Sequence, residues 1–272
     1  MKKKEIFTAD FLPNKQEKLF SYDQYFKLFI KLYKNNLLPN NILLSGQPGL
    51  GKSTFAYHFI NSILSNKEDY SYDFVNFTIN PLNRSFRLIK KQYHPNFYLI
   101  ENFADKQSIS IKQVRDMINY LNKTNYEKKI KFILIDNAEY LNLHSVNALL
   151  KIIEEPNLNT FVIIIHNSSI KLVETLKSRC IEFKIFFSNQ EKQKILENLL
   201  IYYDLKIDIN LLEKIKSFYD SPGIILNLVK LINEAAIDVS NPNLINVISN
   251  LMEFILRNKN NTNLNLLQNT IE

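Results

Sequence analysis

The residues with the clearest chemistry form the run GQPGLGKS at positions 46–53. This run matches the pattern G-x-x-x-x-G-K-[ST], in which the backbone of a glycine-rich loop holds the phosphates of a nucleotide. The glycines allow backbone conformations that a Cβ disfavours, so several N–H groups can point into one concavity. The lysine would reach the β- and γ-phosphates, and the serine hydroxyl would bind Mg²⁺. We therefore predict a nucleotide site with Mg²⁺ that contains Gly46, Gly49, Gly51, Lys52, Ser53 and Thr54.

A second chemical element follows the apolar run FILI at 132–135. Proteins that hydrolyse nucleotides on such a loop use an acid after a second buried strand to help hold Mg²⁺, and Asp136 stands in that place. Hydrolysis also needs a group that polarises the attacking water, but the next residue is Asn137. An amide does not take a proton from water at neutral pH, so general-base help of ~10² to 10⁴ in rate should be largely lost. Glu139 would replace it only if the turn were rebuilt.

These residues require a parallel sheet whose strands end at one edge, and the hydrophobic pattern predicts one. Continuous apolar runs typical of strands covered on both faces occur at 41–45, 97–101, 131–135 and 161–165. Apolar residues at helical spacing predict helices at 53–62, 110–123 and 142–155. The first of the three carries the phosphate loop at its start, and Ser110 with Gln113 predicts a capping box at the start of the second. This alternation indicates a doubly wound α/β fold with its site at the carboxyl ends of the strands.

The strand signals stop at Ser188, and helical patterns take over. Ser188 and Glu191 predict a capping box at the start of one helix, and further helices follow Asp208 and the Ser221-Pro222 pair. One more helix is expected at 244–256, before an Asn-rich tail at 258–272 that we expect to be disordered. The predicted domains are a P-loop domain at 1–187, a small helical domain at 188–238 and a C-terminal segment at 239–272.

Composition limits the class of protein. The hydrophobic content of 46% and the charged content of 22% are those of a soluble globular protein. No apolar run reaches the ~18 residues of a membrane span, and the polar start predicts no signal peptide, so we expect a cytoplasmic protein without a membrane partner. The single cysteine, Cys180, excludes an internal disulfide and a multi-cysteine zinc site. The net charge of +7 suits a partner that carries phosphates but leaves direct DNA contact open.

The chain resembles the bacterial DNA polymerase III clamp-loader subunits, which are AAA+ proteins, and within them the delta-prime type. The resemblance spans roughly residues 36–235 and is carried by GQPGLGKS, by 135–165 and by LKSRCIEF at 176–183. Its most specific feature is the pair formed by NALLKIIEEP at 147–156 and the later SRC at 178–180.

The resemblance implies a heteropentameric ring that uses ATP to open a sliding clamp and place it on primed DNA. Its other members are motor subunits of the gamma/tau type and a delta subunit. Arg179 matches the arginine finger that reaches the ATP of a neighbouring motor subunit, where a guanidinium supplied in trans is worth ~10³ to 10⁵ in rate. A surface residue ahead of a strand is the alternative interpretation of Arg179. Asn167 matches the polar sensor near the γ-phosphate.

The chain departs from the motor subunits of this family at two places and from the pattern of the family at two more. It has Asp136-Asn137 where they carry Asp-Glu, and the segment 221–224 where they carry a lid arginine. The connection at 66–93 stands in place of the family's zinc module, so no zinc is expected. The segment 239–272 is much shorter than the family's C-terminal collar, so the collar is either reduced or incomplete.

Three functions remain open at this point. The first is a non-motor clamp-loader subunit that binds nucleotide, hydrolyses it poorly and donates Arg179 in trans. The second is an active motor of the gamma/tau type with Glu139 as a shifted base. The third is a small-molecule phosphotransferase, for which no acceptor-binding acid or Arg-rich lid is recognisable. Whether the chain has an ATPase activity of its own stays open.

Overall fold

The computed structural model describes residues 11–102, 108–123, 130–155, 159–235 and 244–258. The chain divides into two compact units. The larger unit contains residues 16–47 and 51–186, and the smaller one contains 48–50 together with the described parts of 1–15 and 187–272. The predicted domain limits at 188 and 239 stay a prediction.

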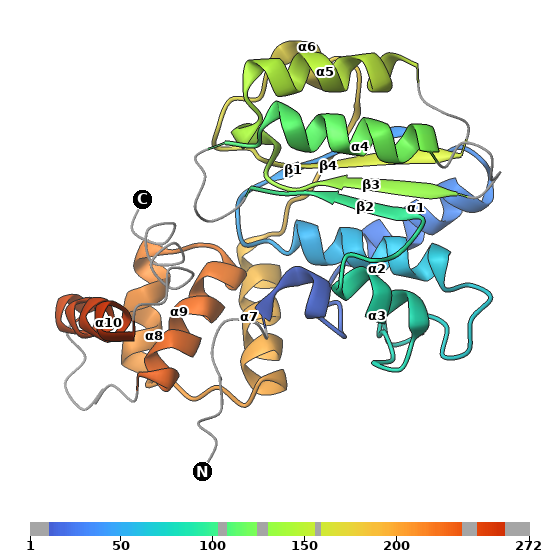
Figure 1. The fold of residues 1–272 in the computed structure, drawn as a ribbon. Helices are drawn as coiled ribbons and strands as arrows, with labels where there is room; N and C mark the ends of the chain where they lie inside the picture. The colour runs from blue at the N-terminus through green and yellow to red at the C-terminus, as the bar shows by residue number, and fades with distance from the viewer. Residues whose placement is uncertain (1–10, 103–107, 124–129, 156–158, 236–243, 259–272) are drawn as a thin grey trace. The chain divides into compact units, whose positions relative to one another are not determined.

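A five-stranded sheet forms the centre of the larger unit, and every strand pair in it is parallel. The strand order is β2-β3-β4-β1-β5. The strands are β1 (Asn41–Gly46), β2 (Phe97–Ile100), β3 (Lys131–Ile135), β4 (Thr160–Asn167) and β5 (Ile181–Lys184). The predicted doubly wound parallel architecture is confirmed, because helices cover both faces of this sheet (Figure 1). The strand β4 continues two residues beyond its predicted end and so includes Asn167.

Two groups of helices enclose the sheet (Figure 1). One face carries α4 (Ile111–Lys123), α5 (Leu143–Glu154) and α6 (Glu174–Lys177). The other face carries α1 (Asp23–Lys34), α2 (Lys52–Leu64) and α3 (Arg84–Lys90). Short 3-10 turns occur at η2 (Pro13–Lys15), in the smaller unit, and at η3 (Ala138–Tyr140) directly after β3.

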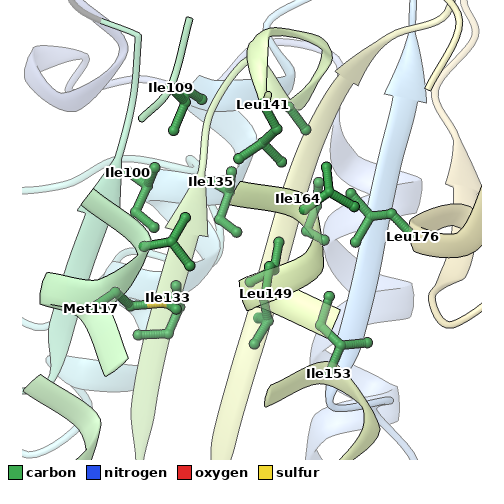
Figure 2. Close-up of a cluster of buried hydrophobic side chains, with 14 of the residues drawn as sticks. Ile100, Ile109, Met117, Ile133, Ile135, Leu141, Leu149, Ile153, Ile164 and Leu176 are labelled. Carbon is green, nitrogen blue, oxygen red and sulfur yellow. The ribbon is translucent and has the colours of Figure 1, made fainter. Parts of the chain in front are cut away.

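The core under α4 and α5 fixes the register of the strands. Ile133 and Ile135 of β3 are fully buried among side chains of these helices, including Met117 and Leu149 (Figure 2). Because side chains alternate along a strand, Phe132, one residue before Ile133, belongs to the opposite face. A shift of one residue would exchange the two faces, so this pattern also fixes which residue follows β3 at the edge of the sheet.

Aromatic rings form the core on the other face and hold the helix that follows the phosphate loop. Phe29 of α1 meets Phe55 and Phe59 of α2 edge-on, with ring centroids 5.1 and 5.3 Å apart. Phe59 in turn lies 6.1 Å from the Phe132 ring of β3. Edge-to-face pairs at these distances are favourable beyond the area that they bury. The sequence reasoning left α1 out, although it supplies this support.

Local capping mostly follows the sequence, with one correction. The Ser188 and Glu191 capping box is present, and Asp208 accepts from the backbone N–H of Leu211. At Ser110 only half of the predicted box forms. The Ser110 N–H donates to Gln113 Oε1 at 2.9 Å, and the Ser110 hydroxyl donates to the same oxygen at 3.1 Å. The Ser110 hydroxyl is turned to that amide oxygen, and the Gln113 N–H donates to the Ser110 backbone oxygen at 3.1 Å instead.

The smaller unit is helical. Its helices are α7 (Asn189–Tyr202), α8 (Ile209–Phe218), α9 (Pro222–Glu234) and α10 (Leu244–Asn258). They pack around a core that includes Leu211, Ile215, Val229 and Leu251. The helix α10 ends two residues later than predicted, and the rest of the Asn-rich tail lies outside the described residues. Among the helices that the structure describes, none combines the length and the apolar character needed to cross a membrane.

Candidate functional site

The glycines of the phosphate loop occupy positions that require glycine. A Cβ on Gly46, the last residue of β1, would lie 2.6 Å from the backbone oxygen of Ile185. That segment approaches closely because the Ile185 N–H donates to the Ser45 oxygen at 2.7 Å. Gly49 and Gly51 have φ angles of +72° and +86°, a region that side chains rarely adopt. The loop therefore turns as the motif predicts before α2 begins.

Lys52 lies inside the turn of the loop and is almost fully buried. Its ammonium group donates to the backbone oxygens of Gly46 at 2.8 Å and Gln47 at 2.6 Å. Burial lowers its pKa to about 8, while the charges of Glu139 and Asp136 act in the opposite direction. An ammonium that donates to neutral carbonyls is suited to exchange them for phosphate oxygens, because hydrogen bonds between charged partners are stronger.

Asp136 follows β3 and meets the start of α2. Its N–H donates to the Ile100 oxygen at 2.8 Å, and its Oδ1 accepts from the Ser53 hydroxyl at 3.0 Å. Burial raises the pKa of this carboxyl to about 6, against the Ser53 hydrogen bond. A hydroxyl and a carboxylate are the hard oxygen donors that Mg²⁺ binds, usually beside phosphates and water. The residues predicted for Mg²⁺ are thus in contact, and their donor set fits that ion.

Asn167 ends β4, the strand between β1 and β3, and pairs in register with Gly46. Its side-chain oxygen accepts from the Ser169 N–H at 3.0 Å, and its own N–H donates to Glu139 Oε2 at 3.1 Å. The predicted sensor residue therefore lies between the loop and Asp136 at the carboxyl edge. Thr54 lies in the first turn of α2 and is half-buried.

The position expected to carry a general base is exposed and has a left-handed backbone. Asn137 has φ 58° and ψ 58°, a conformation that asparagine tolerates better than most residues. Glu139 lies two residues further on, in η3, and its carboxylate is already hydrogen-bonded to the N–H of Asn167. Glu139 is thus near the site, but one of its oxygens is occupied.

The sequence reasoning missed a second acid at this edge, Glu101. It follows β2 directly, and the pairing of Ile100 with Ile135 sets it beside Asp136. Burial raises the pKa of Glu101, and its charge also raises the pKa of Asp136. Its Oε1 accepts from Gln92 Nε2 at 3.1 Å. The signal was present, since FYLIE at 97–101 and FILID at 132–136 both end in an acid.

Arg179 lies at the opposite edge of the sheet from the phosphate loop. Its backbone oxygen accepts from Asn41 Nδ2 at 3.4 Å, and Asn41 is the first residue of β1, whereas Gly46 is the last. At about 3.3 Å per residue, roughly 16 Å of strand separates the two ends. The Arg179 side chain pairs with Glu154, Nε to Oε1 at 2.6 Å. The structure therefore does not bring Arg179 to the nucleotide site of its own chain.

Cys180, the residue after Arg179, is a partly buried thiol. Burial raises the pKa of the Cys180 thiol to about 11, which leaves it protonated and unreactive at neutral pH. Within the part of the chain that the structure describes, no three His, Cys, Asp or Glu side chains are arranged to hold a metal ion.

Solved structures support the fold. The chain is similar to the Thermotoga maritima RuvB Holliday junction branch migration motor, with a TM-score of 0.50 and 18% sequence identity. This likeness covers 90% of this chain and 74% of that one. At this level of identity, the likeness supports the fold and nothing further.

Curated relatives share more of the sequence. The chain is 29% identical over 140 residues to the DNA polymerase III subunit delta' of Pseudomonas aeruginosa, which covers 52% of this chain and 41% of that protein. It is 31% identical over 97 residues to the subunit delta' of Bacillus subtilis, covering 36% of this chain and 29% of that protein. The subunit gamma of Buchnera aphidicola subsp. Acyrthosiphon pisum is 29% identical over 201 residues, covering 73% of this chain and 52% of that protein. The chain thus spans about half the length of these relatives or less.

One protein family matches the central part of the chain. The sequence model described as "DNA polymerase III, delta subunit" covers residues 22–189, which include the loop, Asp136, Asn167 and Arg179. Because this match exceeds half of the 272 residues, the chain belongs to the DNA polymerase III delta-subunit family, and relatives of the delta-prime type are among those that it resembles.

Proposed function

We propose that this chain is the non-motor subunit of a DNA polymerase III clamp loader, which binds ATP or ADP with Mg²⁺ and hydrolyses it slowly or not at all. Its catalytic contribution is Arg179, which reaches the ATP of a neighbouring motor subunit. The partners are gamma/tau-type motor subunits and a delta subunit in a heteropentamer. The sliding clamp and primed DNA are reached through the complex, and the setting is the cytoplasm.

The observation that carries this proposal is the placement of Arg179 at the amino edge of the sheet, away from its own loop. The distance along β1, roughly 16 Å, exceeds the reach of an arginine side chain. Arg179 is 38% exposed in its side chain, so it is open to a partner. A guanidinium there serves a phosphoryl group supplied from outside this chain, where it neutralises charge that builds up during transfer.

The loop is proposed to bind nucleotide in the usual way. Lys52 would exchange its two backbone acceptors, the oxygens of Gly46 and Gln47, for phosphate oxygens. Ser53 and Asp136 would hold Mg²⁺, which neutralises phosphate charge when bound. Asn167, between them, would donate its side-chain amide to the terminal phosphate. These contacts bind and orient the nucleotide without removing a proton from water.

An active motor is the second candidate, and Glu139 is the observation in its favour. Its carboxylate lies at the carboxyl edge, close enough for its charge to act on Lys52. Against it, one carboxylate oxygen already accepts from the Asn167 N–H, which leaves the other oxygen to receive a proton from water. Asn137 offers no base in its place.

Single-turnover hydrolysis separates the two candidates. The isolated chain would be mixed in excess over radiolabelled ATP with Mg²⁺, and both bound nucleotide and released phosphate would be followed. The non-motor proposal predicts bound ATP that stays intact over many minutes. Rapid phosphate release that is lost in Glu139→Gln, while binding is kept, would establish the motor instead. Lys52→Ala, which removes the ammonium from the loop, is the control for loop-dependent binding.

Assembly tests the partners. The chain would be co-expressed with the gamma/tau-type and delta subunits of its own organism, and the complex isolated by size exclusion. A stable complex that contains this chain is expected. Assembly of the other subunits into an active loader that excludes this chain would contradict the proposal.

A further inference from the structure

We propose that Glu154 is a positioning residue for Arg179, which holds the guanidinium with its far end directed away from the protein. This inference rests on the trans role proposed for Arg179. Glu154 is the last residue of α5, and Arg179 lies twenty-five positions later in the turn before β5.

The contacts leave one end of the guanidinium available. Arg179 Nε donates to Glu154 Oε1 at 2.6 Å, and Nη1 donates to the Thr175 backbone oxygen at 3.0 Å. Among the described residues, Nη2 donates to no acceptor. The guanidinium is therefore held at Nε and Nη1, and the two N–H groups of Nη2 remain for a phosphate oxygen.

The backbones on both sides of this ion pair are fixed independently of it. Asn41 Nδ2 donates to the Ile153 oxygen at 2.8 Å and to the Arg179 oxygen at 3.4 Å, so one side chain ties the end of α5 to the turn. The Arg179 N–H donates to Leu176, and Cys180 packs against the core under α5. Glu154 therefore sets the torsions of the Arg179 side chain rather than the path of the chain.

Because both side chains of this ion pair are exposed, we expect the pair to orient Arg179 rather than to stabilise the fold. The Arg179 and Glu154 side chains are 38% and 48% exposed, and ion pairs this open contribute little to folding. A long arginine side chain loses much rotational freedom when it engages a ligand, so a partner that restricts it beforehand reduces that loss. The carboxylate contacts Nε and the Thr175 oxygen contacts Nη1, so neither contact uses the hydrogens of Nη2.

The test uses the assembled loader and a matched neighbour. Glu154→Gln removes the charge and keeps the shape, and Glu155→Gln makes the same change at the adjacent exposed residue. We expect Glu154→Gln to lower the kcat of the DNA-stimulated ATPase roughly two- to fivefold, the range of an exposed ion pair, with an unchanged KM for ATP. Glu155→Gln should match the parent. In an Arg179→Ala background, Glu154→Gln should have no further effect, and thermal unfolding of the chain should not change.

The possible results separate this inference from the function on which it rests. If Arg179→Ala is strongly impaired while Glu154→Gln equals Glu155→Gln, the positioning role is overturned and the trans role stands. If Glu154→Gln raises kcat, the ion pair withholds Arg179 instead of presenting it, and the inference is wrong. If Arg179→Ala itself has normal activity, both claims fail.

Discussion

Nucleotide binding should depend on pH through the two titrating groups of the loop site. Asp136 must be ionised to bind Mg²⁺, and burial raises its pKa to about 6. Lys52 must be charged to bind phosphate, and burial lowers its pKa to about 8. The affinity for Mg²⁺–ADP should therefore be highest between these two values and fall on both sides of them.

The magnitude follows from the two pKa values. At pH 5 the Asp136 carboxyl is about nine-tenths protonated, so the affinity should be roughly tenfold lower than at pH 7, a difference of about 1.4 kcal/mol. At pH 9 Lys52 has lost its proton to a similar extent, and the affinity should again be roughly tenfold lower.

Calorimetric titration of the isolated chain with ADP in excess Mg²⁺, from pH 5 to pH 9, would measure this profile. The ligand also titrates, so the difference between variants is decisive. Asp136→Asn, which cannot ionise, should bind more weakly at neutral pH. It should also lose the part of the fall in affinity between pH 7 and pH 5 that protonation of Asp136 causes. Asp116→Asn, at an exposed position on α4, should keep it. If the affinity of Asp136→Asn for ADP fell as steeply between pH 7 and pH 5 as that of the parent, the assignment of this fall to Asp136 would be wrong.

Three further changes test the account at single positions. Asn137→Glu supplies the missing carboxylate and should raise the rate of single-turnover hydrolysis by up to ~10²-fold. Asn137→Gln, which has a similar left-handed backbone strain, should not raise it. Equal rates in the two variants would count against the role of this position. His58 is fully buried with a pKa lowered from 6.5 to about 3, so it stays neutral while the unfolded chain gains a proton. Stability that is present above pH 6.5 should thus be lost as the pH falls, by about 2.5 kcal/mol between pH 7 and 4.5 in urea unfolding, and His58→Gln should remove that component. Gly46→Ala places a Cβ 2.6 Å from the Ile185 oxygen and should cost about 1 to 3 kcal/mol in the same assay; a stabilised variant would contradict the required close approach.

The strands β1 to β4 could be predicted closely because each is a largely apolar run between polar segments. The edge strand β5 was not included in the predicted sheet, since its sequence IEFK mixes polar and apolar residues and its first and last residues are exposed. Its pairing with β1 depends on backbone hydrogen bonds that leave no periodic pattern in the side chains. The helix α1 was also left out, and its burial of Phe26 and Phe29 depends on contacts with distant rings.

The loop side of the site could be predicted because its residues are close in sequence and each has a fixed task. The motif fixes Lys52 and Ser53, and the strand pattern fixes Asp136 at the end of β3. Neither Glu101 nor Glu154 could be assigned a role in the site from the sequence. Their partners lie 35 and 25 positions away, so only the folded chain brings Glu101 beside Asp136 and Glu154 to Arg179.

The ATPase rate of the assembled clamp loader with Arg179→Ala tests the central claim most directly. Arg115→Ala, at an exposed position on α4, is the matched control. We predict that hydrolysis at the motor site next to this chain falls by ~10³ or more, that steady-state turnover with primed DNA and clamp drops accordingly, and that the control stays normal. The complex should still assemble and bind ATP. Undiminished turnover in a loader that contains Arg179→Ala would contradict the claim that this chain acts on its neighbour's nucleotide.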